Sequence, residues 1–214
     1  GIKEVIIKRW GVSEQNIFVA PNGYDATLFE NLPDQKNARE RLNLPAEAKI
    51  VMYVGSLQAW KGADMLYRLA AAMPDITFVV VGGASDATDG NIITVSKKPY
   101  RLIPLYLRAA DILVAPYPGG DARSEYFFSP VKLFEYMASG VPVIVTDTPA
   151  IREVASAESV YYTSSYSVAV FQGMIKDILS DKVGASKKAL EASVASRRYE
   201  WRARAENIIG FIKK

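Results

Sequence analysis

The sequence of 214 residues contains no cysteine and no histidine. Without them the chain cannot form disulfides, use a thiolate or imidazole in catalysis, or build the usual zinc and copper sites. Any chemistry must therefore use carboxylates, lysine, arginine, hydroxyl groups or backbone amides. The lack of cysteine fits a reducing compartment, and we expect the protein to be cytoplasmic.

Strong charge of one sign and long apolar runs are also absent. The 26 Lys and Arg residues stand against 23 Asp and Glu residues, an excess too small to indicate nucleic acid as a partner. No apolar run approaches the roughly 18 to 20 residues that span a bilayer, and no signal-peptide pattern occurs. The chain begins at Gly1 rather than Met, which suggests that it is part of a longer protein.

Short β-branched runs alternate along the chain with helical patterns. Runs without polar alternation are typical of strands buried on both faces, so we predict an α/β fold, a Rossmann-like parallel sheet flanked by helices. The predicted strands are 17–20, 50–54, 77–81, 92–95, 112–115, 143–145 and 160–162. The helices predicted between them are 35–42, 63–72, 101–110, 131–139 and 150–155.

The two ends of the chain depart from this alternation. Residues 1–15 have a helical pattern and are interpreted as a hinge or linker helix, followed by the main domain at 16–196 and a C-terminal helix at 197–214. Long helices without strands are predicted after the last strand, at 168–179, 186–196 and 201–212. We expect these extra C-terminal helices to pack on the edge of the sheet or on another part of the protein.

Ligands of open parallel sheets bind outside the carboxyl ends of the strands. One predicted strand ends in Gly55 and Ser56, and Lys61 follows before a helix, so backbone and a cation could both approach a ligand. The loop is not a Walker A motif, and a solvated lysine is the plainer interpretation of the loop taken alone. Gly82 and Gly83 follow the next strand, although the GxGxxG pattern is missing.

The segment from Ser129 to Gly140 has the signals of a short helix with defined ends. Ser129 suits the N-cap and Pro130 the first helical position, while Gly140 suits the left-handed stop. Thr148 and Pro149 repeat the capping pattern. At about 100° per residue, residues 131, 134, 137 and 138 form the apolar face. The side chains predicted to face away are Lys132, Tyr136 and Ser139.

Glu135 falls on the boundary between those two faces. It lies just over one turn from a helix N-terminus that can hold phosphate, and its carboxylate could accept hydrogen bonds from sugar hydroxyls beside that phosphate. One helix would then bind both phosphate and ribose. A surface glutamate paired weakly with Lys132 is an equally good interpretation of this residue alone.

The order of the motifs is more specific than any one of them. Residues 129–153 resemble the pattern SPxKxxEYMAxGxPVVxxDxPxxxE, residues 107–116 are similar to YxxADVxVxPS, and residues 19–29 resemble IPNGVD followed by Phe. Together they resemble the C-terminal, nucleotide-sugar-binding domain of the retaining group 1 (family 4) glycosyltransferases, which have the GT-B fold. The likeness runs along most of the chain.

The resemblance implies roles for particular residues. Lys61 would contact the donor diphosphate and Glu135 would bind the ribose hydroxyls, which makes these two the expected catalytic residues. The residues expected to line the same donor pocket are Gly55, Ser56, Gly82, Gly83, Ser129, Pro130, Val131 and Lys132, the last three through backbone amides near the helix start.

Two departures limit this transfer of roles. Ser56 stands where many members have arginine, five positions before the lysine, so one positive charge is missing. Phe127 stands where the family has the first of two glutamates separated by seven residues, and Glu125 is out of register by two. Because members with Ser-Pro-x-Lys vary at this position, we interpret Phe127 as a trait of that subset.

The resemblance implies that the intact protein moves a hexose from a nucleoside diphosphate sugar to an acceptor hydroxyl with retention, without a metal or other cofactor. Its acceptor site would lie on an N-terminal domain that this chain does not contain, so the chain alone would bind donor without turnover. The alternative is a non-catalytic nucleotide-sugar binding module or partner subunit. The replacement of the usual glutamate by Phe127 favours this alternative, whereas the presence of Lys61 and Glu135 argues against it. A sugar-nucleotide epimerase half ranks lower because the chain has no histidine.

Three further features stay open at this level. The basic residues 97–101 could help form a base pocket, although a solvated loop is preferred. Peripheral membrane contact could involve the arginines at 197–204 resting on anionic lipid. Asp86 and Asp89 are too far apart for an Asp-x-Asp metal motif and are expected in a polar loop.

Overall fold

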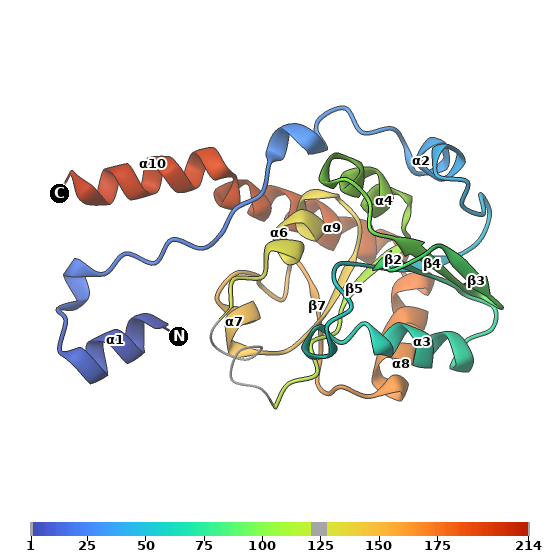
Figure 1. The fold of residues 1–214 in the computed structure, drawn as a ribbon, viewed down its shortest axis with the longest axis horizontal. Helices are drawn as coiled ribbons and strands as arrows, with labels where there is room; N and C mark the ends of the chain where they lie inside the picture. Colours follow the sequence, from blue (N-terminus) through green and yellow to red (C-terminus); the bar gives the residue numbers. More distant parts are fainter. Residues whose placement is uncertain (1, 121–127, 214) are drawn as a thin grey trace.

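The computed structural model describes residues 2–120 and 128–213 (Figure 1). Strands in these residues form one sheet in the order β3-β4-β2-β1-β5-β6-β7. All neighbours are parallel except β3 and β4. Without β3 this is the strand order of dinucleotide-binding folds, which confirms the predicted Rossmann-like α/β class. The strands are β1 (Ile50–Val54), β2 (Thr77–Gly83), β3 (Ala87–Asp89), β4 (Ile92–Ser96), β5 (Ile112–Ala115), β6 (Val143–Thr146) and β7 (Tyr161–Thr163).

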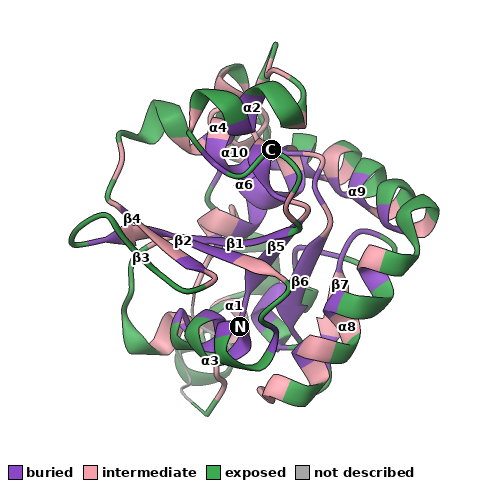
Figure 2. Cartoon of the chain, turned by 90° about the vertical axis from the view of Figure 1, so that its right-hand side faces the viewer, coloured by how far each residue is buried: buried purple, intermediate pink, exposed green. Residues whose placement is uncertain are grey.

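Helices cover both faces of the sheet (Figure 2). On one face α2 (Gln35–Arg41), α4 (Ile103–Ala109) and α6 (Val131–Ala138) join a buried apolar cluster, and on the other face α3 (Asp64–Ala72) and α8 (Val168–Ser180) join a second cluster. Strand β1 contributes side chains to both clusters, since Met52 lies in the first and Tyr53 in the second. This two-sided burial explains the continuous apolar runs in the sequence.

The edge of the sheet beside β7 is closed by α9 (Lys182–Ser196). This helix packs against α6 and α8, and it contributes Ala192 to the first cluster and Ala185 to the second. The short helix α7 (Pro149–Arg152) begins as predicted at Thr148, whose hydroxyl accepts a hydrogen bond from the backbone N–H of Ile151 at 3.4 Å.

The terminal helices α1 (Ile2–Trp10) and α10 (Trp201–Ile212) bury no residue and extend on the same side of the sheet (Figure 1). The segment 17–20, predicted as a strand, is not one. It runs beside α10, where the Phe18 and Phe211 rings stack with centroids 5.3 Å apart and Arg204 Nε donates to the carbonyl of Pro21 at 2.8 Å. No helix in the described residues has both the length and the apolarity to cross a bilayer.

The hairpin of β3 and β4 was not predicted. Asp89 pairs with Ile92 in this hairpin, so the expectation that Asp89 lies in a polar loop is wrong. The three residues of β3 are all exposed and therefore have no apolar pattern to mark a strand. Asp86 does lie in the preceding turn, where its carboxylate accepts a hydrogen bond from the backbone N–H of Ser96.

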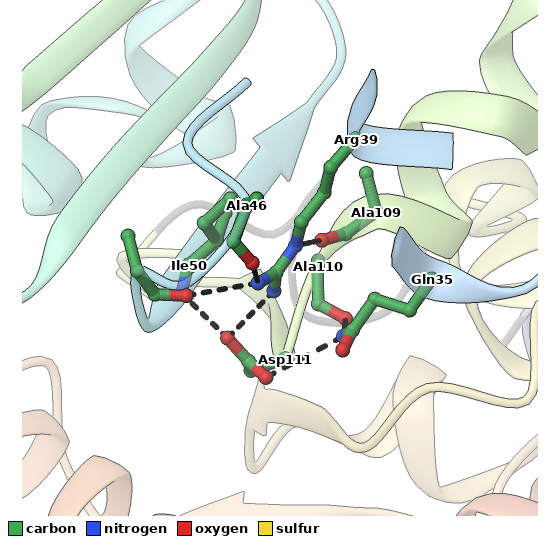
Figure 3. Close-up of polar contacts among 8 residues, drawn as sticks. Gln35, Arg39, Ala46, Ile50, Ala109, Ala110 and Asp111 are labelled. Carbon is green, nitrogen blue, oxygen red and sulfur yellow. Dashed lines mark hydrogen bonds and ion pairs between the residues drawn. The ribbon is translucent and has the colours of Figure 1, made fainter. Parts of the chain in front are cut away.

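A buried polar network ties α2 to the amino ends of the central strands β1 and β5 (Figure 3). Arg39, on α2, is 4% exposed and pairs with Asp111 Oδ2 at 2.9 Å. The same carboxylate oxygen accepts a hydrogen bond from the Ile50 N–H at 2.7 Å. The remaining guanidinium donors reach the carbonyls of Ala46, Ala48 and Ala109, at 2.8 to 2.9 Å.

Candidate functional site

A cavity of about 500 Å³ opens at the carboxyl ends of β1 and β2, beside the loop after β5. The strand order reverses at β1, and parallel sheets bind ligands at this position. Another cavity, of about 540 Å³, lies at the amino ends beside Arg39 and Asp111, where that rule predicts no ligand. The predicted site residues that line the first cavity are Gly55, Ser56, Lys61, Gly82, Ser129, Pro130, Val131, Lys132 and Glu135.

Gly83 is the predicted residue that does not line this cavity. It pairs with Ser96 inside the sheet, and a Cβ atom there would lie 2.6 Å from the Thr94 side chain. Gly82 has φ of +122°, and a Cβ atom on it would lie 2.2 Å from the carbonyl oxygen of Gly55. Glycine at Gly82 therefore lets the ends of β1 and β2 come close together.

Lys61 ends a single 3-10 turn, Ala59–Lys61, between β1 and α3. Its Nζ donates a hydrogen bond to Ser56 Oγ at 2.8 Å and lies 5.1 Å from the centroid of the Trp60 ring. Partial burial lowers the pKa of the Lys61 ammonium. The lysine is thus held in the cavity wall rather than solvated on an open loop.

Lys132 enters the cavity from the first turn of α6. Its Nζ donates to the Tyr53 hydroxyl at 2.9 Å and lies 4.0 Å from the Tyr53 ring centroid and 5.2 Å from that of Tyr117. The pKa of this ammonium lies well below its ordinary value because of burial and, next, the nearby charge of Lys61, whereas Glu135 acts in the opposite direction.

Glu135, one turn further along α6, is 8% exposed. Burial raises the pKa of its carboxyl group, and a hydrogen bond from Tyr100 and the charge of Lys132 lower it by less. A surface glutamate in a solvated ion pair, the alternative interpretation from the sequence, does not describe this residue. A buried carboxylate that lines a cavity is suited to accept hydrogen bonds from hydroxyl groups of a ligand.

The start and the orientation of α6 differ from prediction. Ser129 is not the N-cap, because its Oγ accepts a hydrogen bond from the Asn22 N–H at 2.8 Å, and Pro130 occupies the cap position instead of the first helical one. Tyr136 does not face away from the core. Its buried hydroxyl accepts from the Val54 N–H at 2.6 Å and donates to the Val54 carbonyl at 3.0 Å, and Ser139 is also buried. These bonds tie α6 to the end of β1.

Aromatic residues around the cavity were missed. The Tyr117 ring lies 4.8 Å from the Phe128 ring and 6.5 Å from the Trp60 ring, between centroids. Trp60 follows β1, whereas Tyr117 and Phe128 lie between β5 and α6, so no spacing in the sequence marks the three as a group. Lys97, Lys98 and Tyr100 also line the cavity, and Lys97 and Tyr100 are exposed, so this loop is solvated as preferred and also forms part of the cavity wall. Glu125 and Phe127 lie outside the described residues.

The fold and the site together define a Rossmann-like domain with a cationic pocket at the carboxyl ends of its strands. Residues 34–198 match the sequence model of the family described as glycosyl transferases group 1. This match covers more than half of the chain, and the chain belongs to that family and has one half of its GT-B fold.

Relatives of known name agree with this assignment. The chain is 26% identical over 228 residues to D-inositol 3-phosphate glycosyltransferase of Corynebacterium aurimucosum, covering 95% of this chain and 52% of the relative. Alr3699/HepE from Anabaena, solved in complex with UDP, matches with a TM-score of 0.80 and 19% identity over 99% of this chain and 61% of that one. The C-terminal domain of LpcC from Francisella tularensis matches with a TM-score of 0.67 and 21% identity over 84% of this chain and all of that one. This chain thus spans about half the length of the curated relatives it matches.

Proposed function

We propose that this chain is the C-terminal, donor-binding domain of a glycosyltransferase and that its cavity binds a nucleoside diphosphate sugar. The observation that carries the proposal is the meeting of Lys61, the start of α6 and Glu135 in one cavity at the carboxyl ends of the strands. Membership of a glycosyltransferase family and the UDP complex of a structural neighbour support it.

In this proposal different residues bind different parts of the donor. Lys61 lies against the diphosphate and stabilises the charge that develops on it as the glycosidic bond breaks. Backbone N–H groups at the start of α6 bind the same phosphates, favoured by the positive end of the helix. Glu135 accepts hydrogen bonds from the ribose hydroxyls. We propose that this charge stabilisation comes without a bound metal ion.

The first experiment measures nucleotide binding to the chain. Calorimetric and thermal-shift titrations would use UDP, GDP and ADP with their glucose and mannose conjugates, with and without magnesium. We expect one nucleotide to bind without magnesium and to lose affinity in both Lys61→Ala and Glu135→Ala. Lys187→Ala, on the exposed side of α9, is the matched control and should bind as the wild type does. Absence of binding by every nucleotide at millimolar concentration would contradict the proposal.

We further propose that the intact protein, with an N-terminal acceptor-binding domain, transfers a hexose to a hydroxyl group and retains the anomeric configuration. The alternative of a non-catalytic binding module or partner subunit predicts donor binding without turnover. The test is to incubate the intact protein with the donor that the titration identifies. Release of nucleoside diphosphate and NMR analysis of the sugar product's anomeric configuration separate the two proposals.

A further inference from the structure

Two lysines from different segments meet in the cavity wall. Lys61 follows β1, Lys132 is the second residue of α6, and the charge of Lys61 contributes to lowering the pKa of the Lys132 ammonium. In the part of the chain that the structure describes, neither ammonium forms an ion pair with a carboxylate. Each donates instead to a neutral hydroxyl, Ser56 Oγ or the Tyr53 hydroxyl. Because an ammonium has three N–H donors, both retain donors for a ligand.

A path of hydrogen bonds that runs through Ser56 and Tyr53 links the two ammonium groups. Lys61 donates to Ser56 Oγ at 2.8 Å, the Tyr53 hydroxyl donates to the Ser56 carbonyl at 2.7 Å, and Lys132 donates to that same hydroxyl at 2.9 Å. A Cβ atom on Gly55 would lie 3.3 Å from Lys132 Nζ, so the lysine also lies against the loop backbone after β1. The path positions both cations along one wall.

The surroundings of Lys132 attract a cation but do not neutralise it. The faces of Tyr53 and Tyr117 attract a positive charge, whereas burial of an unpaired charge is costly. In addition, the backbone N–H of Lys132, at the second position of α6, donates to no acceptor in the described residues. The side-chain ammonium and the backbone N–H of Lys132 are therefore both suited to bind an anion.

We propose that the side-chain ammonium of Lys132 is a second cationic ligand of the donor diphosphate, beside Lys61, and that it makes the site select diphosphates over monophosphates. This inference rests on the proposed function. It also accounts for the uncharged Ser56, because Ser56 holds Lys61 in place while Lys132 provides the second positive charge.

The test compares diphosphate and monophosphate binding in Lys132→Met and Lys132→Arg. The ligands are the tightest-binding nucleoside diphosphate of the titration above and its monophosphate. Loss of a charge-assisted contact worth about 1.5 to 3 kcal/mol corresponds to a roughly 10- to 100-fold loss of diphosphate affinity. We expect that loss in Lys132→Met, a much smaller loss for the monophosphate, and partial recovery in Lys132→Arg.

Two controls keep the outcomes apart. Tyr53→Phe removes the hydroxyl that Lys132 contacts but keeps the charge, so it should retain most of the selectivity, and Lys187→Met should change nothing. If Lys132→Met binds the diphosphate as tightly as the wild type while Lys61→Met is weakened, the inference is wrong and the proposed function stands. If Lys132→Met weakens the binding of the diphosphate and of the monophosphate equally, Lys132 has a structural role only. If the wild type binds neither nucleotide, both proposals fail.

Discussion

Replacement of Arg39 by methionine is expected to destabilise the domain strongly. The guanidinium makes four hydrogen bonds of 2.8 to 2.9 Å, one to Asp111 and three to backbone carbonyls, while Arg39 is almost fully buried (Figure 3). Methionine fills a similar volume but leaves the Asp111 carboxylate without its cation. Removal of one partner of a buried ion pair costs about 3 to 5 kcal/mol. At about 2 to 4 °C per kcal/mol for a domain of this size, Tm should fall by roughly 6 to 20 °C.

Urea unfolding followed by circular dichroism measures this free energy. Arg41→Met, an exposed arginine on the same helix, is the matched control and should change stability by less than about 0.5 kcal/mol. Adding Asp111→Asn to Arg39→Met should recover part of the loss, because the lone charge is then removed. If the free energy of unfolding of Arg39→Met lies within about 1 kcal/mol of the wild-type value, the network does not stabilise the amino ends of β1 and β5 as argued.

Three further predictions concern Glu135 in the candidate site and two residues that support the elements around it, Gly62 and Tyr136. Tyr136→Phe should cost about 1 to 3 kcal/mol in urea unfolding, because a buried N–H at the end of β1 loses its acceptor; an unchanged midpoint would contradict this. Gly62→Ala should lower the free energy of unfolding by more than about 1 kcal/mol, because Gly62 has φ of +71° and a Cβ atom would lie 1.7 Å from the Pro116 carbonyl oxygen. Gly173→Ala is the control and should stabilise the protein slightly, because the space around Gly173 in α8 is open. Because the pKa of Glu135 is raised, its carboxylate is protonated at a higher pH than an ordinary carboxyl group as the solution is acidified. Nucleotide affinity should therefore begin to fall at that higher pH, since the carboxylate that accepts hydrogen bonds from the hydroxyl groups is lost. Calorimetric titrations at several pH values should show this loss of nucleotide affinity in the wild type and not in Glu135→Gln.

Local chemistry made the alternation of strands and helices predictable. The run 112–115 is buried on both faces and has no polar position, so its sequence alone marks β5. Gly140 ends α6 with φ of +68°, as its position in the sequence predicted, since glycine adopts this conformation without strain. The ordered motifs identified the family for the same reason: each is a short segment whose own residues carry the signal.

Contacts between distant segments decided the remaining features. Tyr136 is polar at one end and was predicted to face solvent, yet it is buried because Val54, 82 residues away, satisfies its hydroxyl. Ser129 has the chemistry of an N-cap, but Asn22 provides a competing donor from another part of the chain.

The same distinction applies to the site and to the false strand. Residues 17–20 have strand-like composition, but a strand exists only where a neighbour pairs with it, and here α10 lies beside the segment. Lys61 and Lys132 are 71 positions apart, and only the folded sheet brings their charges into one wall. The sequence therefore determined most of the elements and the family, because these depend on neighbouring residues. The tertiary structure decided burial, pairing and the electrostatics of the site, because these depend on which distant groups meet.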